Sequence, residues 1–194
     1  MRPDVRLTGC PRRNEPMRTM PLPPAKITIA VAGPNAVIKV AGRAAVERAR
    51  DFKSAVESLS GSGIRDVYLD LSECLLMDSM FSGVVANLAS GGGPRFTVVV
   101  ANARVLDLLD NLGALRSVRV AHSEERAPAA GDGTELAALP TDKRAMAECC
   151  LEAHRFLMDL KTENRAKFET LEKYLEAEIR SMAPTHAARS PSAP

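Results

Sequence analysis

The stretch LLMDSMFSGVVANLA (residues 75–89) is apolar almost from end to end, but the pair Asp78-Ser79 interrupts it. The apolar residues after this pair recur at helical spacing: Phe81, Val84, Val85 and Leu88. This pattern predicts a helix from about Ser79 to Ala89 that buries one face. Serine is a favoured N-cap residue, so Ser79 is expected to cap the helix and to lie at its exposed end.

Strands and helices alternate on both sides of this helix. The pattern predicts strands at 26–32, 36–41, 66–72, 96–101 and 117–121, and helices at 44–59, 79–89 and 103–113. Gly33-Pro34-Asn35 separates the first two strands and predicts an antiparallel hairpin. The order of elements favours an α/β domain over residues 25–121, with a mixed sheet of about five strands.

The flanking segments differ in composition. Residues 1–24 are rich in Pro and Arg without apolar periodicity, which predicts a disordered lead, and Met17 or Met20 could equally be the true start. A basic arm for nucleic acid is the less favoured interpretation of this lead. Residues 122–140 have the composition of a linker, and residues 184–194 are expected to form a loose tail.

A long amphipathic helical extension is predicted for residues 141–183. Its apolar stripe recurs at steps of three and four: Met146, Cys150, Ala153, Leu157, Leu160, Asn164, Phe168, Leu171, Leu175, Ile179 and Met182. Thr141 or Asp142 can cap its start. The extension could fold back on its own domain as one helix, form a hairpin broken near Asn164, or pack on a second copy or a partner. An apolar stripe of this length needs a cover.

Composition excludes several classes of protein. The net charge is +2 and there is no Trp, which gives no support for nucleic-acid binding or an anionic membrane surface. Four cysteines (Cys10, Cys74, Cys149 and Cys150) match neither a zinc site nor a disulfide framework, so we expect no metal, no cofactor and a reduced, cytoplasmic location. No run is apolar and long enough to span a bilayer, and the lead lacks the apolar core of a signal peptide.

At LDLSECLLMDSMFSGVV (69–85) the chain resembles a STAS domain, the module of anti-sigma factor antagonists and sulphate transporter tails. The residues that carry the resemblance are Asp70-Leu71-Ser72, Asp78-Ser79, Gly42-Arg43 and the segment VVVANARVLDLLDNLGALRSV (98–118), which contains Asn102. It covers residues 26–121. One departure is Phe81, which stands where the family usually has a small residue, whereas the following glycine is retained as Gly83.

The resemblance implies a non-enzymatic switch. Ser79 would be phosphorylated, and the unphosphorylated protein would bind an anti-sigma factor that is a serine kinase, while a serine phosphatase would reset the cycle. The residues expected at the partner interface are Asp78, Met80, Phe81, Ser82, Gly83, Gly42, Arg43 and Asn102. A phosphoryl group adds about −1.5 to −2 charges, which a helix N-terminus tolerates but a docked apolar partner does not.

Other interpretations stay open. Ser82 is the alternative phosphosite, and Ser79 could be a capping residue only. A different class of function is a scaffolding subunit with a degenerate switch and a C-terminal helix that forms a homodimer. The SGGGPRF segment (90–96) runs from helix to strand and therefore does not fit a phosphate-binding loop. We expect His122, His154 and His186 to be ordinary surface or packing histidines.

Overall fold

The computed structural model describes residues 24–100, 102–121 and 131–182. The strands are β1 (Lys26–Ala32), β2 (Asn35–Ala44), β3 (Asp66–Asp70), β4 (Cys74–Met77), β5 (Arg95–Val99), β6 (Arg119–Val120) and β7 (Thr134–Glu135). The helices are α1 (Val46–Gly61), α2 (Ser79–Ser90), α3 (Ala103–Asn111), α4 (Lys143–Leu160) and α5 (Glu163–Ser181), with a 3₁₀ turn η1 (Ala114–Arg116) after α3.

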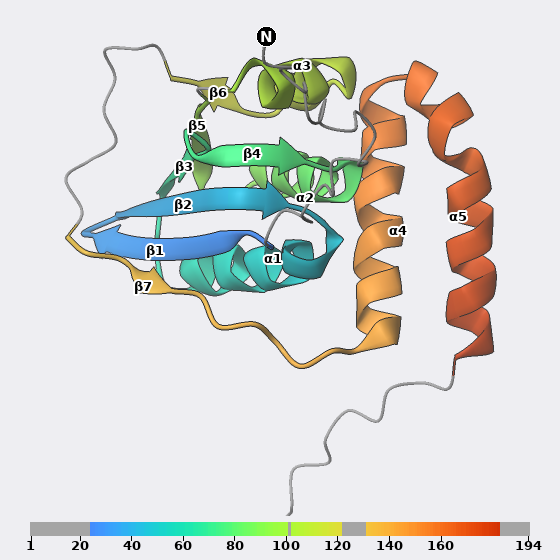
Figure 1. Ribbon diagram of the computed structural model, residues 1–194, viewed down its shortest axis with the longest axis horizontal. Coiled ribbons are helices and arrows are strands. Elements are labelled where there is room, and N and C mark those ends of the chain that lie inside the picture. The colour runs from blue at the N-terminus through green and yellow to red at the C-terminus, as the bar shows by residue number, and fades with distance from the viewer. Residues whose placement is uncertain (1–23, 101, 122–130, 183–194) are drawn as a thin grey trace, which may run out of the picture.

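The strands form one mixed sheet in the order β6-β5-β3-β2-β1-β7 (Figure 1). β1 and β2 form the predicted antiparallel hairpin, whereas β2, β3, β5 and β6 run parallel. The long strand β2 changes neighbours along its length, because residues 35–39 pair with β3 and residues 42–44 pair with β4. The end of β2 is thereby brought beside β4, directly before α2.

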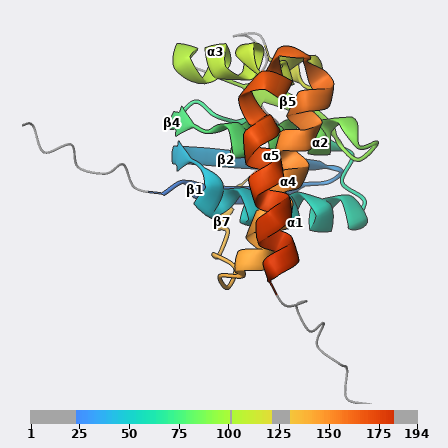
Figure 2. The same ribbon diagram turned by 90° about the vertical axis from the view of Figure 1, so that its right-hand side faces the viewer.

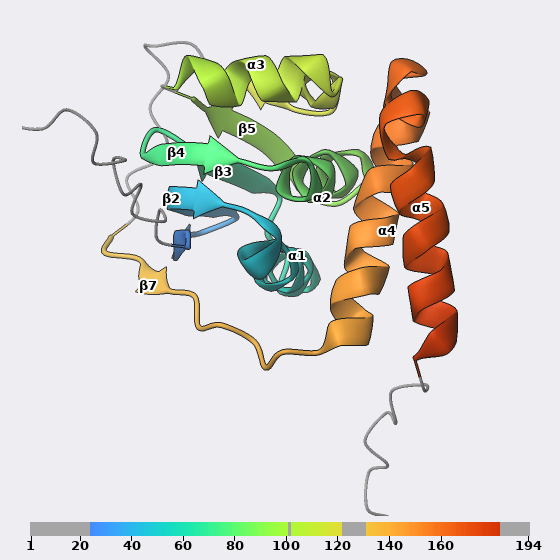
Figure 3. The same cartoon turned by 45° about the vertical axis from the view of Figure 1, so that its right-hand side comes forward.

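Helices α1 and α2 pack side by side against one face of the sheet, as Figure 3 shows. Their apolar faces meet at Phe52 and Phe81, whose ring centroids are 5.0 Å apart and which are both fully buried. The same core takes in the inward residues of the central strands, including Ile38, Val67 and Val98. This arrangement confirms the predicted α/β fold class with a mixed sheet.

The helical extension is a hairpin of α4 and α5, the alternative in which the pattern breaks near Asn164. Asn164 is fully buried, and its amide Nδ2 donates to the carbonyl oxygens of Leu157 (2.7 Å) and Leu112 (2.9 Å). The side chain thus serves one carbonyl in the last turn of α4 and the carbonyl of Leu112, the C-cap residue of α3, which is why a polar residue stands in the apolar row. Figure 2 shows the hairpin lying across the ends of α1 and α2.

Two short strands were not predicted. β4 lies between the predicted strand 66–72 and the predicted helix 79–89, and β7 lies in the segment with linker composition, where it pairs with β1. The predicted disordered lead (apart from Pro24), residues 122–130 and the loose tail fall outside the described residues.

Candidate functional site

Asp78 caps two helices at once. Its carboxylate accepts hydrogen bonds from the backbone N–H of Phe81 (2.8 Å), in the first turn of α2, and of Val46 (2.8 Å), the first residue of α1. Its own N–H donates to the carbonyl oxygen of Ala44 (3.0 Å) at the end of β2. The prediction that Ser79 is the N-cap is therefore wrong. The carboxylate has two oxygens and serves both amides, so Ser79 becomes the first residue of the helix.

Ser79 is half-buried because α4 packs over the start of α2, so it does not lie at an exposed helix end as expected. Its hydroxyl Oγ is 3.0 Å from Nε2 of His154, a buried residue of α4. The other face of the imidazole meets the ring of Phe168 in α5 edge-on, with centroids 4.7 Å apart. His154 thus links the serine to both helices of the hairpin.

The protonation state of His154 follows from its partners. Nδ1 is 2.8 Å from the carbonyl oxygen of Cys150, which can only accept, so Nδ1 carries the proton. Nε2 is then an acceptor, and the Ser79 hydroxyl donates to it. Burial lowers the pKa of His154 below its ordinary value of 6.5, against the opposing effects of the Cys150 carbonyl and the Asp78 charge. The imidazole is neutral near neutral pH.

Gly83 sets how closely α2 and α4 approach. A Cβ atom added at Gly83 would lie 2.6 Å from the carbonyl oxygen of Ala153 and 3.0 Å from its Cβ. Such distances are well inside van der Waals contact, so only glycine allows this packing. Gly83, which the resemblance to STAS domains singled out, thus packs against α4 of the same chain.

Three other expected interface residues face inward. Phe81 packs on Phe52 in the core, and Met80 is 3% exposed. Ser82 is fully buried, and its hydroxyl donates to the carbonyl oxygen of Asp78 (2.8 Å). In this arrangement a partner or a modifying enzyme has no access to the Ser82 hydroxyl, and Phe81 serves the core.

Gly42, Arg43 and Asn102 contact β4, the strand that leads into the Asp78-Ser79 pair. Gly42 has a φ of 88° and lies opposite Cys74, where the register between β2 and β4 shifts. Arg43 forms an ion pair with Glu47. Asn102 caps α3, and its amide donates to the carbonyl oxygens of Cys74 and Leu75 (both 3.1 Å), which ties α3 to β4.

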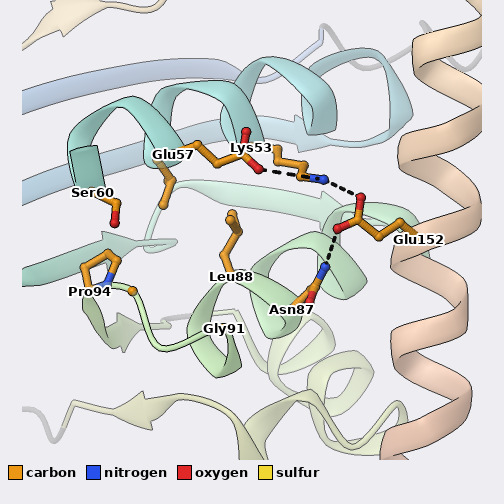
Figure 4. A pocket seen from close by; sticks show the side chains of 10 residues that line it. Lys53, Glu57, Ser60, Asn87, Leu88, Gly91, Pro94 and Glu152 are labelled. Atoms are coloured by element: carbon orange, nitrogen blue, oxygen red, sulfur yellow. Dashed lines mark hydrogen bonds and ion pairs between the residues drawn. The ribbon is translucent and has the colours of Figure 1, made fainter. Parts of the chain in front are cut away.

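A pocket of about 310 Å³ lies between α1, α2 and α4 (Figure 4). At its rim, Glu152 of α4 pairs with Lys53 of α1 and accepts a hydrogen bond from Asn87 of α2 (2.8 Å). Lys53 also pairs with Glu57 (3.8 Å), so its charge is already compensated. The pocket therefore offers no free charge to a ligand, and its polar rim serves to attach α4.

The described part of the chain contains no site for cysteine chemistry or for metal binding. Cys74, Cys149 and Cys150 are free thiols, and burial raises the pKa of Cys150 to about 11. Within residues 24–100, 102–121 and 131–182 no group of His, Cys, Asp or Glu side chains could hold a metal ion. None of the described helices is both long and apolar enough to cross a membrane.

The contact between Ser79 and His154 was missed by sequence reasoning, which treated His154 as an ordinary packing or surface residue. Its only signal is its place beside Ala153 in the apolar stripe of the extension. His122 and His186 lie outside the described residues.

Two solved structures are similar in fold to this chain. One is an anti-sigma factor antagonist from Mycobacterium paratuberculosis, with a TM-score of 0.46 and 15% identity over 52% of this chain and 87% of that chain. The other is the protein TM1081, with a TM-score of 0.44 and 22% identity over 59% of this chain and 90% of that chain. No protein-family model matches the chain, and no curated protein matches it.

Proposed function

We propose that this protein is a phosphorylation-switched binding module that acts as an anti-sigma factor antagonist in a partner-switching pathway. The observation that carries the proposal is the position of Ser79 in the first turn of α2, directly after the carboxylate that caps both α1 and α2. The sequence resemblance to STAS domains assigns the phosphorylated serine to this position. The chain itself would do no catalysis and would need no cofactor.

The chemistry of the switch is simple. A serine kinase transfers the γ-phosphoryl group of ATP to the Ser79 oxygen, a new P–O bond forms, ADP leaves, and the hydroxyl proton passes to a base. The dianion then stands at a helix N-terminus, whose dipole favours negative charge, so the fold is retained. A partner that covers this surface must desolvate the new charge, and a penalty of about 3 kcal/mol weakens binding more than a hundredfold.

The unphosphorylated form would bind an anti-sigma factor with serine kinase activity, and a serine phosphatase would remove the phosphate. These partners place the protein in the cytoplasm, in keeping with its free thiols. The direct test is mass spectrometry of the protein from its own cells, where phosphate is expected on Ser79. Ser79→Asp should keep the circular dichroism of the wild type and lose the kinase partner, whereas Ser79→Ala should keep it. Equal binding by both variants would contradict the proposal.

A second candidate is a scaffolding subunit with a degenerate switch. It is favoured by the burial of Phe81 in the core and by the engagement of Ser79 with His154. Its predicted homodimer would use the hairpin, where Tyr174 of α5 is 63% exposed. Size measurement in solution distinguishes the two. A stable dimer that carries no serine phosphate favours the scaffold, and a phosphorylated monomer favours the switch.

A further inference from the structure

We propose that the α4–α5 hairpin is an autoinhibitory cover, which keeps the Ser79 hydroxyl and the adjoining surface of α2 closed to modifying enzymes and to partners until α4 moves away. This inference rests on the proposed function and adds its regulation. The occupant of the docking surface is a segment of the same chain, residues 143–181, which is seated on it in the structure.

The first support is that α4 takes the contacts that a partner would need. His154 accepts the hydrogen bond of the Ser79 hydroxyl at 3.0 Å. One turn further along α2, the backbone of Ala153 fills the space beside Gly83. A protein that docks on Ser79 and Gly83 must therefore displace α4.

The second support is the way in which α4 is buried on two sides. Cys149 and Ala153 belong to the main core, whereas Ala147 and Leu151 form a separate cluster with Leu175 of α5. Arg155 of α4 also pairs with Glu172 and Glu176 of α5. Because α5 covers the outer face of α4, the two helices can leave α2 together without exposing the second cluster.

The third support is that tethers lie at both ends of the hairpin, outside the switch. At one end Asn164 and Lys161 hold the carbonyl oxygens of Leu112 and Asn111. At the other end the connection before α4 is held by α1, where Arg50 donates to the Pro140 carbonyl oxygen (2.9 Å) and Asp51 accepts from the N–H of Leu139 (3.2 Å). Opening breaks the contacts of Asn164 and Lys161, whereas the connection before α4 keeps the hairpin near the site, so that it can close again.

The geometry fixes the order of events. A phosphoryl group on Ser79 needs the space that Nε2 of His154 occupies at 3.0 Å, and the close contact of Gly83 with Ala153 holds α4 from shifting while it stays packed. Opening must therefore come before phosphorylation, and the phosphate then keeps α4 from returning to its place.

The test uses the full chain with a variant that opens the hairpin. Ala153 is 1% exposed and faces Gly83, so Ala153→Asp puts a charge into the α2–α4 contact without changing α2. Ala166→Asp is the matched control, because Ala166 is exposed on α5. Reaction with a thiol reagent, followed by peptide mass spectrometry, reports opening at Cys149, which is 6% exposed on α4, and integrity of the domain at Cys74, which is 1% exposed in β4.

We expect Ala153→Asp to speed labelling of Cys149, assigned by fragmentation separately from its neighbour Cys150, by about tenfold or more, with Cys74 as slow as in the wild type. In the protein's own cells, the phosphate occupancy of Ser79 should rise in the same variant and not in Ala166→Asp. If Ala153→Asp also speeds labelling of Cys74, the uncharged Ala153→Leu, which overpacks the same contact, replaces it.

The outcomes separate the two proposals. Faster labelling of Cys149 together with unchanged phosphate on Ser79 overturns the cover and leaves the switch. If labelling shows that the hairpin is open but none of the proteins carries phosphate on Ser79, both the switch and the cover are overturned. If neither Ala153→Asp nor Ala153→Leu speeds the labelling of Cys149, α4 does not separate from α2 as a cover, and the inference is overturned.

Discussion

The carboxylate of Asp78 lies 2.8 Å from the backbone nitrogen of Val46, thirty-two positions earlier in the chain. The N-cap residue of α1 is Ala45, which has no side chain able to accept, so Asp78 does this work from the start of α2. The carboxylate that interrupts the apolar stretch thus fixes the starts of α1 and α2 relative to each other.

Asp78→Ala should remove both caps and lower the free energy of unfolding by about 2 kcal/mol, roughly 1 kcal/mol for each cap. Asp78→Asn keeps one acceptor oxygen and should lose about half as much. Urea unfolding followed by circular dichroism measures both values. Asp107→Asn, on the exposed face of α3, is the control and should be neutral within about 0.5 kcal/mol. Equal stability of Asp78→Ala and the control would refute the double cap.

Gly83→Ala should disturb the packing of α2 on α4, since the new methyl group would meet the Ala153 carbonyl oxygen at 2.6 Å. A loss of about 1–3 kcal/mol is expected for such overpacking. Gly61→Ala is the matched control, because Gly61 ends α1 with nothing within 4 Å of the added carbon. Thermal unfolding of the two variants should separate them clearly. A Gly83→Ala protein as stable as Gly61→Ala would mean that α4 does not approach α2 as closely as described.

His154 should make stability depend on pH. Burial lowers its pKa in the folded protein below the ordinary value of 6.5, so the unfolded chain binds a proton that the folded chain lacks. The free energy of unfolding is not reduced by His154 above about pH 6.5. It falls as the pH drops from there through the pKa of His154 in the folded protein.

His154→Gln does not titrate, and the other two histidines are unchanged in it. The wild type should therefore lose more stability than His154→Gln when the pH is lowered from about 7.5 to about 5. Urea titrations at several pH values give both curves. Parallel curves would show that the imidazole titrates alike in the folded and unfolded states.

Asn164→Asp should be more damaging than Asn164→Ala. The carbonyl oxygens of Leu112 and Leu157 both accept hydrogen bonds from the Asn164 amide, and a carboxylate would place an acceptor against them. We expect about 1–3 kcal/mol for the alanine variant and more for the aspartate. Thr170→Ala, exposed on α5, is the control for the helix itself. The reverse order of the two Asn164 variants in denaturant unfolding would contradict the assignment of the amide nitrogen as the atom that contacts both carbonyls.

Periodicity in the sequence predicted most strands and helices of residues 25–121, since strands such as β5 (Arg95–Val99) are mostly apolar and follow clear turn residues. β4 escaped prediction because Leu75 and Leu76 are both about half-exposed and do not alternate with polar residues. β7 has only two residues, Thr134 and Glu135, and is held by pairing with β1, which no local pattern reveals.

The candidate site was predicted only in part. Motif spacing identified the Asp78-Ser79 pair, but the division of roles between the two side chains depends on where α1 begins. The contact of Ser79 with His154 joins residues 75 positions apart. It depends on the turn at Lys161-Thr162, which folds α5 over α4, and on Gly83, which lets α4 approach. These are features of packing, and the apolar stripe predicted only that some surface would cover it.

Because the α4–α5 hairpin is tethered to its own domain, its inhibition does not depend on the concentration of the protein. A blocking segment carried on the same chain is present at an effective concentration set by the connecting residues, which is of the order of millimolar for short links. Dilution of the protein or a change in its expression leaves that value as it is, in contrast to inhibition by a second copy. A competitor must therefore exceed a fixed local threshold, however much of the protein the cell makes.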